Sequence, residues 1–200
     1  MKKKQEIQPT GIDYSEVYVY AMEQTNRDAL QCAFGSNYTV EDYNDNWNLK
    51  TYDRYSTADA WITNNTLKTK TIWETKARPD VHIYDYEDGF FNVKKAASLE
   101  KIRAKHPYLQ IYVALVYPKE RAVVAYPLEA VTACPVKSVR ALSPDQDRYV
   151  DEQNYLVPVS NVDRVHDAGG YIRHWCGCDW DDMYAYNERM GIELSERGLL

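Results

Sequence analysis

The sequence contains no hydrophobic run long enough to cross a membrane as a helix. Three lysines near the N-terminus are followed by polar residues and Pro9, where a signal peptide has an apolar segment. We therefore expect no signal peptide and no membrane partner, and we expect a cytoplasmic protein.

Cysteine is scarce, and its spacing is irregular. The four cysteines form no regular disulfide framework, and the last two are too close together for an ordinary structural disulfide. A chain of 200 residues can bury a core without disulfides or a metal. These features favour a reducing, intracellular setting. The cysteines are Cys32, Cys134, Cys176 and Cys178.

An excess of basic residues is also missing. The formal net charge of -6 argues against a protein that coats nucleic acid by bulk electrostatics. Only residues 59–126 carry more basic than acidic side chains, so a polyanionic substrate would be drawn to this segment. Eighteen tyrosines against three phenylalanines indicate half-exposed strands and wet surfaces.

Hydrophobic periodicity predicts a mixed α/β chain with the order helix, three strands, helix, strand and strand. Residues 109–117 are nearly all apolar, which is typical of a strand buried on both faces. The other expected elements are a helix from Asp13 or Ser15 to Phe34 that Gly35 ends, a connection over 36–48, an antiparallel meander of strands over 49–56, 58–63 and 69–78 with a turn at Asn64-Asn65, a helix over 90–105, and a strand over 121–128.

The chain shows no repeat and no flexible linker, and we expect one main domain over 13–128. Residues 1–12 are expected to be a disordered lead-in. Residues 129–200 are expected to be a loop-rich extension packed on the core, with a strand over 155–159 and a helix near 181–190.

The stretch Thr71–Arg78 carries the clearest chemical pattern. Side chains alternate between the two faces of a strand, so Glu74 and Lys76 share one face while Trp73 and Thr75 point to the other. If the turn at Asn64-Asn65 folds the chain back, Asp59 comes opposite Glu74. Two carboxylates and one ammonium then lie together.

Paired carboxylates without a nearby histidine suit a hard cation such as Mg2+ or Mn2+. Such an ion lowers the pKa of bound water and stabilises charge on a phosphate. Lys76 would orient the attacking water or screen the developing charge.

The pattern Asp59…Glu74-Thr75-Lys76, within an αβββαβ element order over residues 13–128, resembles the PD-(D/E)XK nuclease superfamily. The resemblance implies a restriction-endonuclease-like core, with a mixed sheet flanked by helices. It also implies that Asp59, Glu74 and the Thr75 carbonyl bind the metal, with Lys76 as the catalytic lysine.

Two further positions follow from the same resemblance. A lysine on the helix after the meander matches Lys95 best, with Lys94 next, and an acid from the first helix matches Glu23, with Glu16 as its alternative. Two features depart from the pattern: Ala58 stands where many members have proline, and no decisive local pattern selects Glu23 over Glu16. Asp53 would replace Asp59 if the strands of the meander took a different register.

The implied function is a Mg2+- or Mn2+-dependent deoxyribonuclease of phage or mobile-element type, or a resolvase-like or repair enzyme. Its partner would be duplex, branched or single-stranded DNA, with a homodimer as the assembly to test. One alternative is a catalytically inactive module of the same fold that binds nucleic acid or protein. Another is an unrelated tyrosine-rich α+β interaction protein, in which Asp59 and Glu74 would lie far apart.

The C-terminal region offers one more candidate site. His174, Cys176 and Cys178, with His166, have the donor types of a zinc site, but the spacing matches no usual zinc finger. Two free cysteines in a turn is the preferred interpretation. The many tyrosine and tryptophan rings are candidates for stacking on bases, although packing explains most of them.

Overall fold

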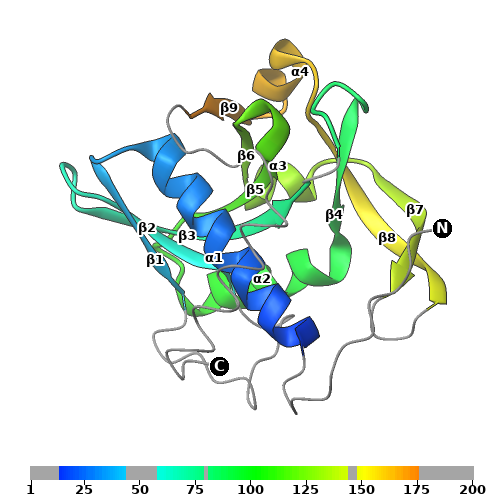
Figure 1. Cartoon of the computed structure of the whole chain (residues 1–200), viewed down its shortest axis with the longest axis horizontal. Helices are drawn as coiled ribbons and strands as arrows, with labels where there is room; N and C mark the ends of the chain where they lie inside the picture. Colours follow the sequence, from blue (N-terminus) through cyan, green and yellow to red (C-terminus); the bar gives the residue numbers. More distant parts are fainter. Residues whose placement is uncertain (1–13, 44–57, 79–80, 144–147, 176–200) are drawn as a thin grey trace.

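The computed structural model describes residues 14–43, 58–78, 81–143 and 148–175 (Figure 1). The expected lead-in over 1–12, strand over 49–56 and helix near 181–190 lie outside the described residues. The elements are α1 (Tyr14–Phe34), β1 (Tyr38–Asp42), β2 (Ala60–Asn64), β3 (Thr69–Ala77), β4 (Asp88–Asn92), α2 (Val93–Lys105), β5 (Ile111–Tyr117), the short 3-10 helix η1 (Pro118–Glu120), β6 (Ala122–Pro127), α3 (Leu128–Thr132), β7 (Val136–Ser143), β8 (Arg148–Pro158), α4 (Val162–Asp167) and β9 (Tyr171–His174).

A six-stranded sheet with the order β1-β2-β3-β5-β6-β9 forms the centre of the fold. Strands β3 and β5 are parallel, and the other neighbours in this sheet are antiparallel. The chain passes from β3 to β5 through β4 and α2. A second, three-stranded sheet has the order β4-β8-β7. The protein is therefore mixed α/β with a mixed main sheet.

The apolar segment Ile111–Tyr117 is a central strand, as predicted. Its odd-numbered side chains enter one hydrophobic cluster, while Ala114 and Val116 enter a second cluster on the other face of the sheet. Burial on both faces explains why this strand shows no alternation of apolar and polar residues. The two clusters also define the layers of the molecule.

Helix α1 covers one face of the main sheet, where Ala29 and Leu30 pack on residues of β2, β3, β5 and β6. The helix ends as predicted at Gly35, whose φ of +75° is the left-handed conformation that glycine adopts without strain. The Gly35 N–H donates to the Gln31 carbonyl at 2.8 Å.

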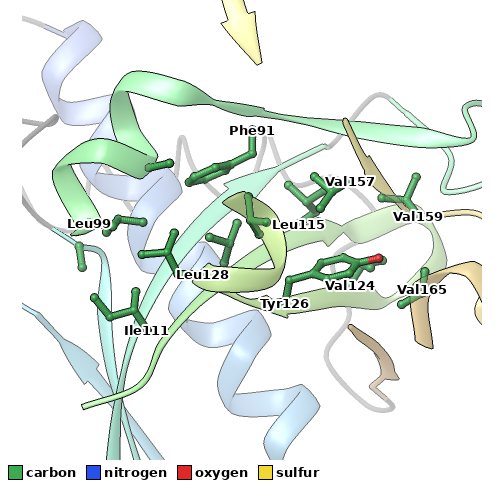
Figure 2. Packing of buried hydrophobic residues seen from close by; sticks show 14 of the residues in the cluster. Phe91, Leu99, Ile111, Leu115, Val124, Tyr126, Leu128, Val157, Val159 and Val165 are labelled. Atoms are coloured by element: carbon green, nitrogen blue, oxygen red, sulfur yellow. The ribbon is translucent and has the colours of Figure 1, made fainter. Parts of the chain in front are cut away.

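The opposite face of the main sheet is covered by α2, α3 and the second sheet. Figure 2 shows Phe91 and Leu99 together with Leu115 and Leu128 in this larger cluster, which Val157 also joins. Two elements that are adjacent in sequence, β4 and α2, thus contribute to the same layer.

Helix α2 begins three residues later than expected. Residues 90–92 belong to β4, which pairs with β8, and the Asn92 side chain then caps the helix by accepting from the N–H groups of Lys94 and Lys95. The helix ends before His106, as predicted. Pairing with a distant strand, rather than local spacing, decides where the helix starts.

The expected connection over 36–48 is wrong at Tyr38–Asp42, which forms the edge strand β1 and pairs with β2. Its acidic and polar residues resemble a loop because an edge strand is half exposed to water. The strands of the meander predicted over 58–63 and 69–78 are confirmed as β2 and β3. They pair in antiparallel register across the turn after Asn64.

The expectation of a loop-rich segment after residue 128 is wrong for the described part of it. Strand β8 includes most of the predicted strand over 155–159 but is 11 residues long, and it pairs with β7. Strand β9 extends the main sheet beside β6. Val157 and Val165 are buried in the larger cluster, so this region and the preceding strands share one core.

No helix of the described residues combines the length and hydrophobicity needed to cross a membrane. Among the described cysteines, Cys134 is free and Cys32 is disulfide-bonded. A disulfide is more typical of an oxidising compartment. The cytoplasmic location stays a prediction.

Candidate active site

Glu74 is fully buried in β3 between two lysines. The Lys76 ammonium lies 3.1 Å from one carboxylate oxygen, Oε1, and the Lys95 ammonium lies 3.0 Å from the other, Oε2. The Lys95 side chain is itself buried, whereas 42% of the Lys76 side chain is exposed. The site therefore has a buried end at α2 and an open end at Lys76.

Glu74 and Lys76 share one face of β3, as the alternation of the strand predicts. Ile72, on the same face, packs in the cluster beneath α2, while Trp73 packs on the other side beneath α1. This placement lets Lys95 reach Glu74 from α2.

Asp59 immediately precedes β2, and its charge acts on the Glu74 carboxyl. The last pair of the ladder is Ala60 with Trp73, and the Asp59 N–H also donates to the Trp73 carbonyl at 2.9 Å, so Asp59 lies at the end of the ladder beside Trp73. The Asp59 side chain is held by Thr75, whose backbone N–H and hydroxyl donate to Oδ2 at 2.6 and 2.8 Å. The two halves of the motif are thus locked together.

The Thr75 carbonyl is directed toward the same edge of β3. In a strand, the N–H and C=O of one residue point to the same side, and the Thr75 N–H points at Asp59. The carbonyl predicted as a metal ligand is therefore on the side of β3 where Asp59 lies.

The electrostatics of the site favour a proton on Glu74 near neutral pH. Burial, with a smaller contribution from the charge of Asp59, raises the pKa of Glu74 to about 7, although Lys76 and Lys95 oppose this shift. Partial protonation near pH 7 makes this carboxyl sensitive to any cation that enters the site.

Lys76 stays charged. Desolvation lowers the pKa of Lys76, but the nearby carboxylates of Glu74 and Asp59 outweigh it, and the net pKa is raised. Glu23 of α1 also raises the pKa of Lys76, so its charge acts on this lysine as expected for an acid near the site. The side chain of Glu16 lies outside the described residues, and so does Asp53.

The neighbouring lysines of α2 differ in their environments. Lys95 is 4% exposed and contacts Glu74, whereas Lys94 is exposed. The structure therefore brings Lys95, the preferred of the two lysines, together with Asp59, Glu74 and Lys76.

Arg27 of α1 is part of the site's support, and the sequence interpretation missed it. It is 3% exposed, and it donates to the Asp59 carbonyl at 3.3 Å while forming an ion pair with Asp42 of β1 at 3.3 Å. Its position four residues after Glu23, on the same side of the helix, is the sequence signal that could have identified it.

The donor atoms present fit a hard cation. Both oxygens of Glu74 are buried and lack a hydrogen bond of good geometry, although each is within ion-pair distance of a lysine. Both hydrogen bonds from Thr75 go to Asp59 Oδ2. In the described part of the chain, no donor is bonded to the other carboxylate oxygen, Oδ1. Oxygen atoms from two carboxylates and a carbonyl are ligands that Mg2+ and Mn2+ accept.

The third carboxylate expected from Glu23 is not assembled with Asp59 and Glu74. Within the described ranges, no three side chains of the His, Cys, Asp and Glu types are grouped so that they could hold a metal. Mg2+ sites that act on phosphates often use only one or two carboxylates, with water and substrate oxygens completing the coordination.

The zinc candidate in the C-terminal region is not assembled among the described residues. His166 lies in α4 and His174 lies in β9, while Cys176 and Cys178 are outside the described residues. No evidence from this part of the chain supports zinc.

Comparison with known proteins identifies no family. No protein-family model matches the chain, and no curated protein matches it. The function of the site is therefore inferred from its residues and geometry.

Proposed function

We propose that this protein is a metal-dependent nuclease that hydrolyses DNA phosphodiester bonds at Asp59, Glu74 and Lys76. The observation that carries the proposal is the buried Glu74 carboxylate, which has a lysine at each oxygen, with Asp59 held beside it by Thr75. A chain without a reaction to perform has no evident need to bury this combination of charges, since burying a charge is costly.

The arrangement of elements supports a restriction-endonuclease-like core of the PD-(D/E)XK type. A helix, three antiparallel strands, a helix and a strand parallel to the third strand follow one another, with β4 inserted before α2. The acidic and basic residues lie immediately before the second strand, in the third strand and in the second helix. These are the positions that the sequence resemblance implies.

The roles of the residues follow from their exposure and charge. Asp59, Glu74 and the Thr75 carbonyl would hold Mg2+ or Mn2+, and the bound ion would lower the pKa of a water and stabilise charge on the phosphate. Lys76 is partly exposed and charged, so it can contact a phosphate oxygen or orient the attacking water. Lys95 is buried and holds the Glu74 carboxylate in place.

The test is cleavage of plasmid, single-stranded and branched DNA by the full chain in Mg2+ or Mn2+. We expect Glu74→Gln and Lys76→Met to reduce the rate by at least about a hundredfold, because each removes a charge that acts on the transition state. Lys94→Ala is the matched control, since it removes an exposed lysine beside the site and should cut like the wild type. Absence of metal-stimulated cutting on all three substrates would contradict the proposal.

A second candidate is an inactive module of the same fold that binds nucleic acid. The observation that favours it is that Lys76 and Lys95 already compensate the charge of Glu74 without an ion. Manganese titration monitored by calorimetry separates the two. A nuclease should bind Mn2+, and Glu74→Gln should abolish that binding. An inactive module should bind DNA but should neither bind Mn2+ nor cut.

A further inference from the structure

A second candidate site lies on the other face of the main sheet. Trp73 precedes Glu74 in β3 but packs beneath α1, and it lines a cavity of about 270 Å3. We call this cavity the aromatic pocket. Its lining includes Phe34, Asn64, Gln110, Tyr112, Tyr171 and Arg173.

One wall of the aromatic pocket is a supported tyrosine ring. Tyr112 stacks on Trp73 with a centroid distance of 4.7 Å and an interplanar angle of 13°. Trp73 is 2% exposed, so it backs the half-buried Tyr112 ring without itself being open to a ligand. Tyr171 contacts Tyr112 edge-on at 6.5 Å. A planar ligand ring can stack against such a fixed aromatic surface.

Arg173 gives the aromatic pocket a positive charge. Its guanidinium lies 4.4 Å from the centre of the Phe34 ring and 5.8 Å from that of Tyr171. Among the described residues, no carboxylate forms an ion pair with Arg173, and no acidic residue lines the pocket. A guanidinium with a fixed plane and no acidic partner is a recognition group for phosphate.

Asn64 and Gln110 add two side-chain amides to the pocket, and their NH2 groups are hydrogen-bond donors. The Asn64 Oδ1 atom accepts from the N–H groups of Thr66 and Leu67, which leaves the amide NH2 for a ligand. The Gln110 Oε1 atom accepts from the Tyr112 hydroxyl, which likewise leaves its NH2. In the described part of the chain, neither NH2 group has an acceptor. The matching ligand is flat and anionic, and it carries hydrogen-bond acceptors.

We propose that the aromatic pocket binds a nucleotide, with its base against Tyr112 and its phosphate at Arg173. The carbonyl oxygens of the base supply acceptors for the amides of Asn64 and Gln110. A free mononucleotide and one unit of a single strand share this chemistry. The proposal is independent of cleavage at Glu74, because the two sites lie on opposite faces of the sheet.

The test measures binding of the full chain in EDTA, where no metal-dependent cleavage occurs. Calorimetric titrations use thymidine 5′-monophosphate, thymidine, inorganic phosphate and a short thymidine oligonucleotide. Arg173→Gln and Gln110→Ala alter the aromatic pocket. Arg140→Gln is the matched control, because Arg140 also lies over a tyrosine ring, that of Tyr149 at 5.6 Å, but belongs to the second sheet. Thermal unfolding checks that each variant is folded.

We expect Arg173→Gln to weaken nucleotide binding by about tenfold or more, as for loss of a charge-assisted phosphate contact. Gln110→Ala should weaken it by a smaller factor, and it tests the pocket if Arg173→Gln fails to fold. Thymidine and phosphate alone should each bind more weakly than the complete nucleotide. Lys94→Ala, which removes an exposed lysine near the site at Glu74, should leave binding unchanged.

The two nucleotide sources give different results. Binding of the mononucleotide indicates a pocket for a free nucleotide, whereas binding of the oligonucleotide alone indicates a pocket for a strand. Either result supports the proposal if it depends on Arg173. No binding of either ligand, or an equal loss in Arg140→Gln and Arg173→Gln, overturns it.

Discussion

The Lys95 ammonium lies 3.0 Å from Glu74 Oε2, and both side chains are buried between α2 and the main sheet. This ion pair joins α2, which lies between β3 and β5 in the chain, to β3. A buried charge that loses one partner destabilises a protein far more than an exposed pair does. The pair therefore links the chemistry of the site to the stability of the fold.

Replacement of Lys95 by methionine should lower the free energy of unfolding at pH 8 by about 2 kcal/mol or more, because it leaves Glu74 with one ammonium partner. Urea unfolding at equilibrium measures the change. Lys94→Met, at the neighbouring exposed position, should stay within about 0.5 kcal/mol of the wild type. Equal effects of the two substitutions would show that the buried pair contributes nothing.

The stability of the metal-free protein should decrease with rising pH through the titration of Glu74. The pKa of Glu74 is about 7 in the folded protein, whereas the ordinary value of a glutamate, which applies to the unfolded chain, is 4.5. The folded state therefore binds the proton more tightly than the unfolded state does. The resulting stabilisation is complete below about pH 4.5 and is lost as the pH rises through 7, a change of about 3 kcal/mol.

Glu74→Gln isolates this effect, because glutamine does not titrate. The difference in unfolding free energy between wild type and variant, measured in EDTA from pH 4.5 to 8, should change by about that amount. A difference that is constant over this range would show that the pKa of Glu74 is not raised.

The Thr75 hydroxyl should help to orient Asp59. Thr75→Val keeps the shape of the side chain but removes the donor 2.8 Å from Asp59 Oδ2, while the backbone donor at 2.6 Å is retained. We expect a loss of about 1 kcal/mol in stability and weaker Mn2+ binding. Calorimetry with Mn2+ measures the second effect, and Thr75→Ser, which keeps the hydroxyl, should bind like the wild type.

Arg27 should be more important for stability than an exposed arginine. Arg27→Met removes the contacts of a buried guanidinium with the Asp59 carbonyl and with the Asp42 carboxylate. We expect a loss of about 2 to 3 kcal/mol in chemical denaturation. Arg103→Met is the control, since 43% of the Arg103 side chain is exposed and its ion pairs are on the surface. A similar small loss in both variants would contradict this role.

The local pattern of the sequence was sufficient to predict several elements. The apolar run over 109–117 predicted a strand buried on both faces, and Gly35 predicted the end of α1, because these features depend on nearest neighbours and on backbone conformation. The alternation in β3 placed Glu74 and Lys76 on one face. The choice of Lys95 over Lys94 also agrees with its position beside Glu74.

Long-range pairing determined the parts that the sequence did not predict. Strand β1 has a polar sequence and exists because β2 offers it a partner, while β7 and β8 form a hairpin in a region expected to be loops. Arg27 gained its role because α1, β1 and β2 meet at its side chain, which no local pattern specifies.

By itself, the sequence determined the order of most elements and the face of β3 on which the charges lie, because a strand has a fixed period of two. Only the tertiary structure decided that Asp59 is bonded to Thr75 beside Glu74, that Lys95 is buried against Glu74, and that Tyr112 and Arg173 line a pocket on the opposite face. Those relationships depend on strand register and on packing between residues far apart in the chain.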